Sequence, residues 1–247
     1  MTQTWMMTAP KSRISKRELK ILMDLSDVKR WILAIEKGKN GYEHWQCRFT
    51  ASDPELFERW TELNPWIHLE KAQTDDFKYE RKEGRFWTSD DTVEILRCRF
   101  GTPRGWQQDL LKRIEQQSVR EIDVILDSYG NKGKTWLTVH LWELGKALVV
   151  PRYSCTPEKL SAFVCSAYKG ESIIIIDIPR AGKPTTALYE CMEEVKDGLV
   201  FDPRYSGTTR DIRGVKLVVF TNHKLKLDQL SDDRWVLHGI TIDGRLS

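Results

Sequence analysis

Three short aliphatic runs in the second half of the chain constrain its fold more than any other feature. They read IDVILD at 122–127, SIIIIDIP at 172–179 and KLVVFTN at 216–222, and segments with helical patterns lie between them. Strands that are aliphatic throughout are buried on both faces, as in a parallel sheet covered by helices. The sequence therefore predicts an α/β domain in this half of the chain.

The first hundred residues follow another pattern, in which helical and strand-like spacings of apolar residues alternate. Two strand-like runs, at 28–38 and 42–52, are joined by a Lys/Asn/Gly turn, so we expect them to pair as antiparallel neighbours. Helical segments are expected at 15–25, 54–63 and 75–84, and a further short strand at 66–72. This order predicts an α+β domain with a central antiparallel sheet flanked by helices.

A cluster of Gly and Pro in RFGTPRGWQQ, at 99–108, separates the two patterns. Such clusters mark the exposed linkers between domains. With 247 residues the chain is long enough to bury two modest cores. We therefore expect one domain at residues 1–101 and another at 102–247.

The amino-acid composition indicates the compartment of the protein more clearly than its function. Lys and Arg number 39 against 36 Asp and Glu, so net charge alone does not indicate a nucleic-acid partner. The five cysteines form no Cys-x-x-Cys pair, which is typical of reduced thiols and not of a disulfide framework or a structural zinc site. The longest aliphatic run is too short to cross a bilayer. These features predict a soluble intracellular protein with no membrane partner.

The segment DSYGNKGKTWL follows the first aliphatic run and has the strand, loop and helix context of a phosphate-binding loop. The backbone amides of such a loop can hold a β-phosphate, Lys134 can reach the β- and γ-phosphates, and Thr135 can bind Mg²⁺. Ser128 stands where such loops usually begin with Gly. A chance GKT sequence after a strand is the alternative.

Three polar residues further along are candidates to complete a nucleotide site. Asp177 ends the second aliphatic run, where a carboxylate can bind Mg²⁺, although it could instead cap the next helix. Asn222 ends the third run and could orient the attacking water, or it could be a turn residue. Arg234 could reach a γ-phosphate bound to a neighbouring subunit, but taken alone it is more typical of a solvated surface charge. The expected nucleotide-binding residues are Gly130, Asn131, Lys132, Gly133, Lys134, Thr135 and Asp177.

A second set of candidates lies in the first half of the chain. His44 and Gln46 are two apart in a strand-like run, so their side chains lie on one face. Glu36 ends the preceding run, and antiparallel pairing can bring its carboxylate to the same place. One imidazole, one amide and one carboxylate leave positions open on a divalent ion, which favours Mg²⁺ or Mn²⁺ over a closed zinc site. A structural histidine is the alternative.

A tyrosine and a lysine follow at helical spacing. If the segment 75–84 is helical, Tyr79 and Lys82 face the same way. A phenol with a pKa of about 10 attacks a phosphate at neutral pH only when a metal polarises that phosphate. Attack would form a phosphotyrosine bond and free a 3′ hydroxyl, while Lys82 neutralises phosphate charge or assists proton transfer. A buried Tyr beside a solvated Lys is the alternative.

Taken in order, these motifs resemble the HUH endonuclease domain of the Rep proteins of small circular single-stranded DNA viruses, which initiate rolling-circle replication. WMMTAP at 5–10 is similar to the first motif of that family, and HWQ at 44–46 to the circovirus-like His-x-Gln form of its metal motif. IHLEKA at 67–72, followed by YERKEG, resembles the run that ends in Tyr-x-x-Lys. The resemblance implies that Tyr79 nicks origin DNA and becomes linked to its 5′ end. It also implies a Mg²⁺ or Mn²⁺ ion bound by Glu36, His44 and Gln46.

The second half of the chain resembles the superfamily 3 helicase domain of the same Rep proteins, an α/β P-loop (AAA+-like) fold. The resemblance rests on the phosphate-binding loop, the acid at the end of SIIIIDIP, FTN at 220–222 and LSDDRW at 230–235, and the loop itself looks closest to smacovirus-like members. It implies ATP with Mg²⁺, a homo-oligomer that is typically a hexamer, and Arg234 acting on the neighbouring subunit's nucleotide. The segment 199–214 occupies the place of a DNA-contacting hairpin, so Arg204, Tyr205 and Arg210 are expected to bind DNA through phosphate contact and stacking. A solvated hairpin is the alternative.

Together the two resemblances predict a rolling-circle replication initiator that nicks and rejoins origin DNA and unwinds duplex with ATP. Its expected partners are single-stranded DNA, an origin stem-loop, further copies of the chain and host replication machinery. The expected location is the host nucleus, and KSRISKR at 11–17 is a weak import candidate. Two alternatives remain: an origin-binding or transcription-repressing protein without nicking activity, and a P-loop ATPase alone.

Overall fold

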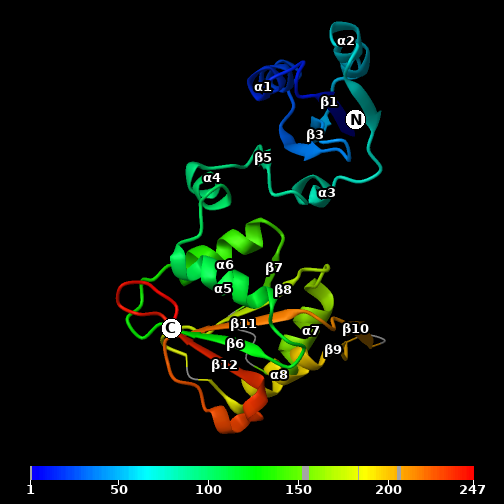
Figure 1. Ribbon diagram of the computed structural model, residues 1–247. Helices are drawn as coiled ribbons and strands as arrows, with labels where there is room; N and C mark the ends of the chain where they lie inside the picture. The colour runs from blue at the N-terminus through cyan, green and yellow to red at the C-terminus, as the bar shows by residue number, and fades with distance from the viewer. Residues whose placement is uncertain (1, 152–155, 183, 205–206) are drawn as a thin grey trace. The chain divides into compact units, whose positions relative to one another are not determined.

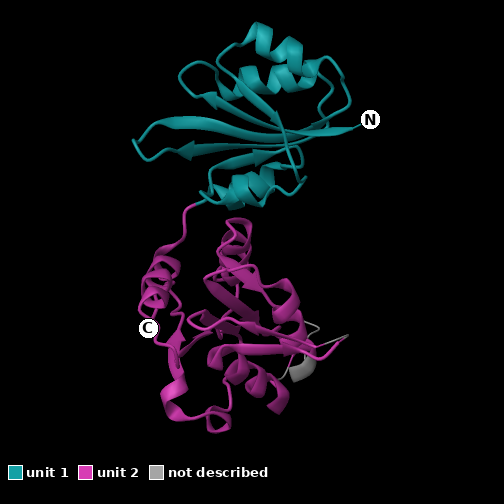
Figure 2. Ribbon diagram, turned by 90° about the vertical axis from the view of Figure 1, so that its right-hand side faces the viewer, with its two compact units in different colours: residues 1–101 teal, residues 102–247 magenta. Residues whose placement is uncertain are grey.

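The computed structural model describes residues 2–151, 156–182, 184–204 and 207–247. The chain forms two compact units, residues 1–101 and 102–247, which are coloured separately in Figure 2. The division falls inside the Gly- and Pro-containing stretch at 99–108. Each unit has its own sheet and its own hydrophobic core.

Residues 1–101 fold around one antiparallel sheet with the strand order β4-β1-β3-β2-β5. The strands are β1 (Gln3–Pro10), β2 (Arg30–Lys37), β3 (Glu43–Ala51), β4 (His68–Lys71) and β5 (Phe86–Thr88), and the helices are α1 (Lys16–Leu25), α2 (Leu56–Leu63), α3 (Lys78–Arg81) and α4 (Val93–Arg99). The helices and strands predicted between residues 15 and 72 are confirmed. The pattern does not predict β5 or α4, and α3 is shorter than the helix expected at 75–84.

The strand β3 gives the two faces of this sheet different characters. Trp45, Cys47 and Phe49 are buried in the main hydrophobic core with residues of α1 and α2. His44 and Gln46 occupy the alternate positions, so they lie on the opposite face. The candidate residues His44 and Gln46 therefore lie on the face of the sheet that is turned away from the main core.

Residues 102–247 contain a parallel sheet with the strand order β12-β6-β11-β8-β7 and a separate two-stranded hairpin. The strands of the sheet are β6 (Ile122–Leu126), β7 (Ala147–Val149), β8 (Ile173–Asp177), β11 (Lys216–Thr221) and β12 (Trp235–Gly239), and the hairpin is formed by β9 (Leu199–Asp202) and β10 (Thr208–Asp211). The helices are α5 (Gly105–Glu115), α6 (Lys134–Glu143), α7 (Pro157–Ala167) and α8 (Thr186–Asp197), with two short 3₁₀ turns, η1 (Leu227–Gln229) and η2 (Asp232–Arg234). The parallel arrangement of the aliphatic strands is confirmed.

Helices cover both faces of this parallel sheet, as its aliphatic strands require (Figure 1). On one face Trp106 of α5 and Leu137 of α6 pack in a core cluster with Ile175 of β8. On the other face α7 and α8 pack against the alternate strand positions, where Tyr189 and Met192 are fully buried. The carboxyl ends of β6, β8 and β11 then lie together at one edge. Within the described residues, no helix combines the length and apolar character needed to cross a bilayer.

Candidate functional sites

The candidate residues of the first unit form a chain of contacts on the sheet face opposite the main core, beside a small hydrophobic cluster of Ile32, Ala34 and Phe86. Glu36 of β2 lies directly opposite His44 of β3 in the antiparallel register, and His44 Nε2 is 3.6 Å from Glu36 Oε2. Lys82 Nζ is 3.2 Å from the same carboxylate oxygen and 3.7 Å from the centroid of the Tyr79 ring. The structure thus brings together four predicted site residues. Tyr79 is 52% exposed, so the alternative of a buried tyrosine is wrong.

Gln46 shares this face but makes a contact that sequence reasoning missed. Thr8 of β1 lies opposite Gln46, and its hydroxyl donates a 2.8 Å hydrogen bond to Gln46 Oε1. That bond fixes the orientation of the amide and leaves the second lone pair of the oxygen available. Thr8 belongs to the WMMTAP motif, and its place on the same face of the neighbouring strand is the signal that could have identified it.

The donor set fits a hard divalent cation. Glu36 is only 6% exposed, and its Oε1 atom has no hydrogen-bond partner among the described residues. A buried carboxylate oxygen without a partner is costly, and a cation would satisfy it. One carboxylate oxygen, one amide oxygen and one imidazole nitrogen suit Mg²⁺ or Mn²⁺. The described part of the chain contains no group of three or more His, Cys, Asp and Glu placed for a metal, so this set depends on its glutamine.

Lys82 is held as a cation. Burial opposes the charged form, but the hydrogen bonds with Tyr79 and Glu36 outweigh it and raise the pKa of the Lys82 ammonium. An ammonium that keeps its proton at neutral pH stabilises negative charge. The geometry therefore favours charge neutralisation over proton transfer as the role of Lys82.

In the second unit, the segment between β6 and α6 has the shape of a phosphate-binding loop. Gly130, Asn131 and Gly133 have positive φ angles of 79°, 57° and 85°, and the helix begins at Lys134. The left-handed conformation of Gly130 favours glycine at that position. Successive backbone N–H groups in such a turn, together with a helix N-terminus, form an anion-binding concavity.

This loop opens onto a cavity of about 550 Å³. The cavity brings together every residue predicted to bind the nucleotide, and Asn222 as well. Its lining residues are Arg104, Asp127, Gly130, Asn131, Lys132, Gly133, Lys134, Thr135, Trp136, Asp177, Ile178, Pro179, Arg180 and Asn222. Asp177 and Asn222 reach it from the carboxyl ends of β8 and β11, the position at which open parallel sheets bind ligands.

Asp127 is a further residue of this cavity that the sequence analysis missed. It is fully buried, and its carboxylate accepts hydrogen bonds of 2.6 Å from Lys134 Nζ and 2.7 Å from the Gly130 amide. Its backbone carbonyl accepts a 2.5 Å hydrogen bond from the Asn222 side chain. An acid that ends a buried strand one residue before the loop is the sequence signal for it. The carboxylate occupies two donors that a bound phosphate would also use.

The helix α5 fixes the backbone of the loop from the other side. Trp106 Nε1 donates a 2.9 Å hydrogen bond to the Lys132 carbonyl, and Gln107 Nε2 donates one of the same length to the Gly133 carbonyl. Both side chains are buried. These two hydrogen bonds tie the Lys132 and Gly133 carbonyls to α5.

Arg234 is buried and paired within its own chain. It is 3% exposed, and its guanidinium is paired with Asp197 at 2.6 Å and Glu193 at 3.3 Å, both on α8. The interpretation as a solvated surface charge is therefore wrong. The next residue, Trp235, pairs with Ile122 at the start of β6, whereas the phosphate-binding loop follows the end of β6. Action on a neighbouring subunit's nucleotide stays a prediction.

The hairpin expected between Asp177 and Asn222 is present as β9 and β10, which pair antiparallel. Arg204 donates hydrogen bonds of 2.7 and 2.8 Å to Asp202, and the Arg210 guanidinium donates to the Tyr168 carbonyl. Tyr205 lies outside the described residues. DNA contact by this hairpin stays a prediction.

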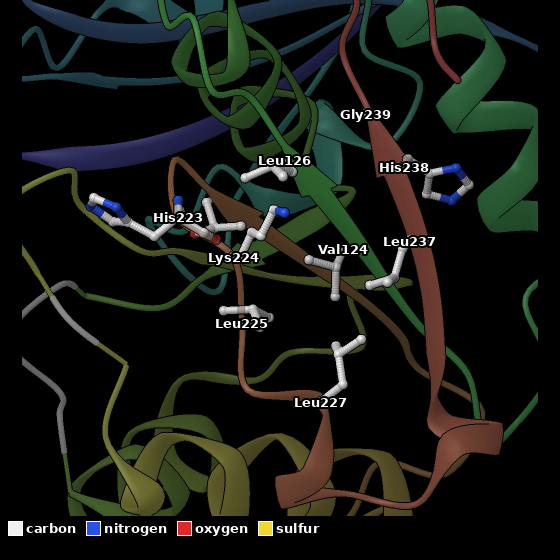
Figure 3. Close-up of a pocket in the computed structure, with 10 residues that line it drawn as sticks. Val124, Leu126, His223, Lys224, Leu225, Leu227, Leu237, His238 and Gly239 are labelled. Carbon is white, nitrogen blue, oxygen red and sulfur yellow. Dashed lines mark hydrogen bonds between the residues drawn. The ribbon is translucent and has the colours of Figure 1, made fainter.

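A second cavity, of about 360 Å³, lies against β6 and β12 and differs in chemistry (Figure 3). Val124, Leu225, Leu227 and Leu237 line it, and no carboxylate does. His238 points away from Val124 and Leu237 in the close-up, and its Nε2 lies 2.7 Å from Asp123 Oδ1. Among its described lining residues there is neither an anion-binding loop nor a carboxylate, so we do not assign this hollow to a nucleotide.

Comparison with known proteins points to viral replication proteins. No protein-family model matches the chain. The Master replication protein of banana bunchy top virus is 30% identical over 130 residues, which is 53% of this chain and 43% of that protein. Para-Rep C10 of the Milk vetch dwarf C10 alphasatellite is 30% identical over 143 residues, 53% of this chain and 46% of its own length. The Master replication protein of subterranean clover stunt virus is 24% identical over 132 residues, 53% and 44% of the two chains.

The chain thus spans less than half the length of these curated relatives. The expected resemblance to viral replication proteins is confirmed, at about 30% identity over half of the chain. The helicase resemblance and the circovirus-like and smacovirus-like details stay predictions.

Proposed function

We propose that this protein initiates rolling-circle replication by nicking and rejoining single-stranded origin DNA through Tyr79. The observation that carries the proposal is the contact chain from the exposed Tyr79 ring through Lys82 to the buried Glu36–His44 pair. The similarity to proteins named master replication protein supports it independently.

In the proposed step the Tyr79 hydroxyl oxygen forms a bond to the scissile phosphorus, and the bond from phosphorus to the 3′ oxygen breaks. The phenolic proton is lost to solvent, the 3′ oxygen takes up a proton, and the 5′ end stays attached as a phosphotyrosine. Glu36, His44 and Gln46 would hold Mg²⁺ or Mn²⁺, which when bound draws charge from the phosphate oxygens. Lys82 keeps its proton and offsets the negative charge that builds up beside Tyr79. Attack by a 3′ hydroxyl on the phosphotyrosine reverses the step and rejoins the strand.

We further propose that residues 102–247 bind and hydrolyse ATP to unwind duplex DNA. Lys134 would contact the β- and γ-phosphates, Thr135 and Asp177 would hold Mg²⁺, and Asn222 would orient the attacking water. The shared cavity at the strand ends supports this assignment. Arg234 would act on the nucleotide of a neighbouring subunit; within its own chain it is paired with carboxylates of α8 near the start of β6.

The proposed partners are single-stranded DNA, an origin stem-loop, further copies of this chain in a hexameric ring and host replication machinery, with the host nucleus as the place of action. The hairpin residues Arg204 and Arg210 would contact the unwound strand through its phosphates.

Labelled DNA tests the nicking proposal. The protein is incubated with Mn²⁺ and an origin oligonucleotide that carries its label at the 3′ end, and in parallel with the same oligonucleotide labelled at the 5′ end. The account predicts that the 3′ label becomes attached to protein while the 5′ label leaves on a shorter free strand. Tight binding without transfer of either label would support the alternative of an origin-binding protein that does not cut DNA.

A further inference from the structure

The helix that carries Tyr79 is too short to hold its own position. The helix α3 has four residues, and its N-cap, Phe77, makes no side-chain capping hydrogen bond. Helices of this length are unstable without tertiary contacts. The direction in which Tyr79 points must therefore be set by side chains that tie α3 to the sheet.

One such contact is a buried ion pair. Glu80, next to Tyr79, is 1% exposed, and Arg48 Nε donates a 2.9 Å hydrogen bond to its Oε1 atom. Arg48 Nη1 also donates to the Thr74 carbonyl at 2.8 Å and to the Thr74 hydroxyl at 3.0 Å. A single guanidinium thus binds both α3 and the segment that leads into it.

Arg48 also belongs to the strand that carries two candidate metal ligands. His44, Gln46 and Arg48 occupy alternate positions of β3 and share one face. Successive residues of a helix differ by about 100° in direction, so a fixed Glu80 fixes the direction of Tyr79. The ligands and the anchor of the tyrosine helix are therefore parts of one rigid strand.

Stability alone is a weak reason for this pair. Burying two charges costs solvation energy, and apolar residues of similar volume often stabilise a fold equally well. In addition, Glu80 Oε2 has no hydrogen-bond partner among the described residues, which adds to the cost. A directional contact, unlike an apolar one, defines a single orientation of the helix.

We propose that the Arg48–Glu80 pair positions Tyr79 against the metal-binding face of the sheet. Both are positioning residues, and the inference rests on the proposed nicking activity. The pair acts on the chemical step, so its loss slows formation of the phosphotyrosine and leaves the binding of DNA and of Mn²⁺ nearly unchanged.

The test compares Glu80→Gln, Arg48→Lys and the apolar double variant Arg48→Met/Glu80→Leu with the wild-type protein. Single-turnover rates of adduct formation are measured at saturating Mn²⁺ and oligonucleotide, with oligonucleotide affinity and thermal unfolding measured in parallel. We expect Glu80→Gln and the double variant to react about 10- to 100-fold more slowly, with affinity within about threefold of wild type. Arg48→Lys keeps the positive charge but loses the planar guanidinium with its several donors. Its rate of adduct formation should therefore lie between theirs and that of wild type.

A second buried ion pair of the same unit provides the matched control. Arg99 Nη2 is 2.7 Å from Asp91 Oδ1, with side chains 2% and 7% exposed, and neither residue lies on α3. Asp91→Asn should lower the thermal stability and leave the adduct rate of the remaining folded protein unchanged. A double variant that is folded and reacts at the wild-type rate would overturn the inference while the nicking proposal stands.

A readout without DNA separates the two proposals. 3-Fluorotyrosine is placed at position 79, and its ¹⁹F resonance is recorded in the full chain. The inference predicts one narrow resonance in wild type and a broadened or split resonance in Glu80→Gln. Identical narrow resonances in both would contradict the positioning role. If the wild-type protein forms no adduct, the nicking proposal itself is wrong. The Arg48–Glu80 pair would then have no role in nicking.

Discussion

The Lys134 ammonium donates a 2.6 Å hydrogen bond to the buried carboxylate of Asp127. The Gly130 amide donates to the other oxygen of the same carboxylate at 2.7 Å. An internal anion thus engages two of the donors that a nucleotide phosphate would use. A phosphate that binds in the loop would have to displace this carboxylate from the Lys134 and Gly130 donors, or lie next to its negative charge.

Replacement of Asp127 by Asn should therefore tighten the binding of ADP in the absence of Mg²⁺. Removing one negative charge near the phosphates relieves a repulsion of about 1 kcal/mol or more, which corresponds to about fivefold in affinity. Isothermal titration calorimetry in the presence of EDTA measures the affinity of each variant for ADP. Asp123→Asn serves as the control, since Asp123 is a fully buried acid at the other end of β6, bonded to Gln117 and His238. Weaker ADP binding by Asp127→Asn would show that the carboxylate supports the loop instead of competing.

Loss of the Lys134 side chain should remove ATP hydrolysis. Lys134 lies at the N-terminus of α6 on the wall of the 550 Å³ cavity, where it can contact the transferred phosphate. Lys134→Ala is expected to lower turnover by about 100-fold or more, because one positive charge at the phosphates disappears. Phosphate release assays compare it with Lys146→Ala, an exposed lysine after α6. Unchanged turnover in Lys134→Ala would remove the proposed motor.

Thr8→Val tests the hydrogen bond that orients Gln46, one of the proposed metal ligands. The Thr8 hydroxyl holds the Gln46 amide by a 2.8 Å hydrogen bond, and valine has nearly the same shape without the donor. Loss of a side chain that orients a metal ligand typically lowers the metal affinity by about 10- to 100-fold. We expect the Mn²⁺ concentration needed for half-maximal nicking to rise about tenfold. Thr4→Val on the same strand should leave it unchanged, and an equal rise in both variants would count against a specific role for Thr8.

Lys196 gives the second unit a pH-dependent stability. Burial and the neighbouring positive charge of Lys216, opposed by Asp123, lower the pKa of Lys196 from 10.5 to about 8, while in the unfolded chain it returns to 10.5. Between these values the unfolded chain binds a proton that the folded chain does not, so this group's contribution to stability rises with pH. From pH 7.5 to 9.5 the free energy of unfolding of wild type should rise by about 1–2 kcal/mol relative to Lys196→Met. Urea unfolding of both proteins at pH 7.5 and 9.5 measures this difference in the free energy of unfolding. A difference that stays constant or falls with pH would contradict the lowered pKa of Lys196.

The placement of the first site was predictable because it depends on local geometry. Strand alternation alone puts His44 and Gln46 on one face, and the short turn between β2 and β3 sets the register that brings Glu36 opposite His44. The parallel strands were predictable for a similar reason, since a strand that is aliphatic throughout must be covered on both faces.

The features that could not be predicted depend on contacts between distant segments. The burial of Arg234 is due to two acids on α8, about forty positions earlier in the sequence, and no local pattern marks that pairing. The strand β5 has three residues, too few for periodicity to show. The contacts of α3 and of Lys82, which follows it, run to Arg48 on β3 and Glu36 on β2, more than thirty positions earlier in the sequence.

The most direct test concerns the proposed attachment of DNA to Tyr79. Tyr79 and Tyr42 are 52% and 51% exposed, and Tyr42 stacks on His44 with ring centroids 6.4 Å apart, so Tyr42→Phe is a matched control. Each variant is incubated with Mn²⁺ and a labelled origin oligonucleotide, and peptide mapping by mass spectrometry locates the linkage. The account predicts an adduct on Tyr79 in wild type and in Tyr42→Phe, and none in Tyr79→Phe. An undiminished adduct in Tyr79→Phe, or a linkage on another residue, would contradict it.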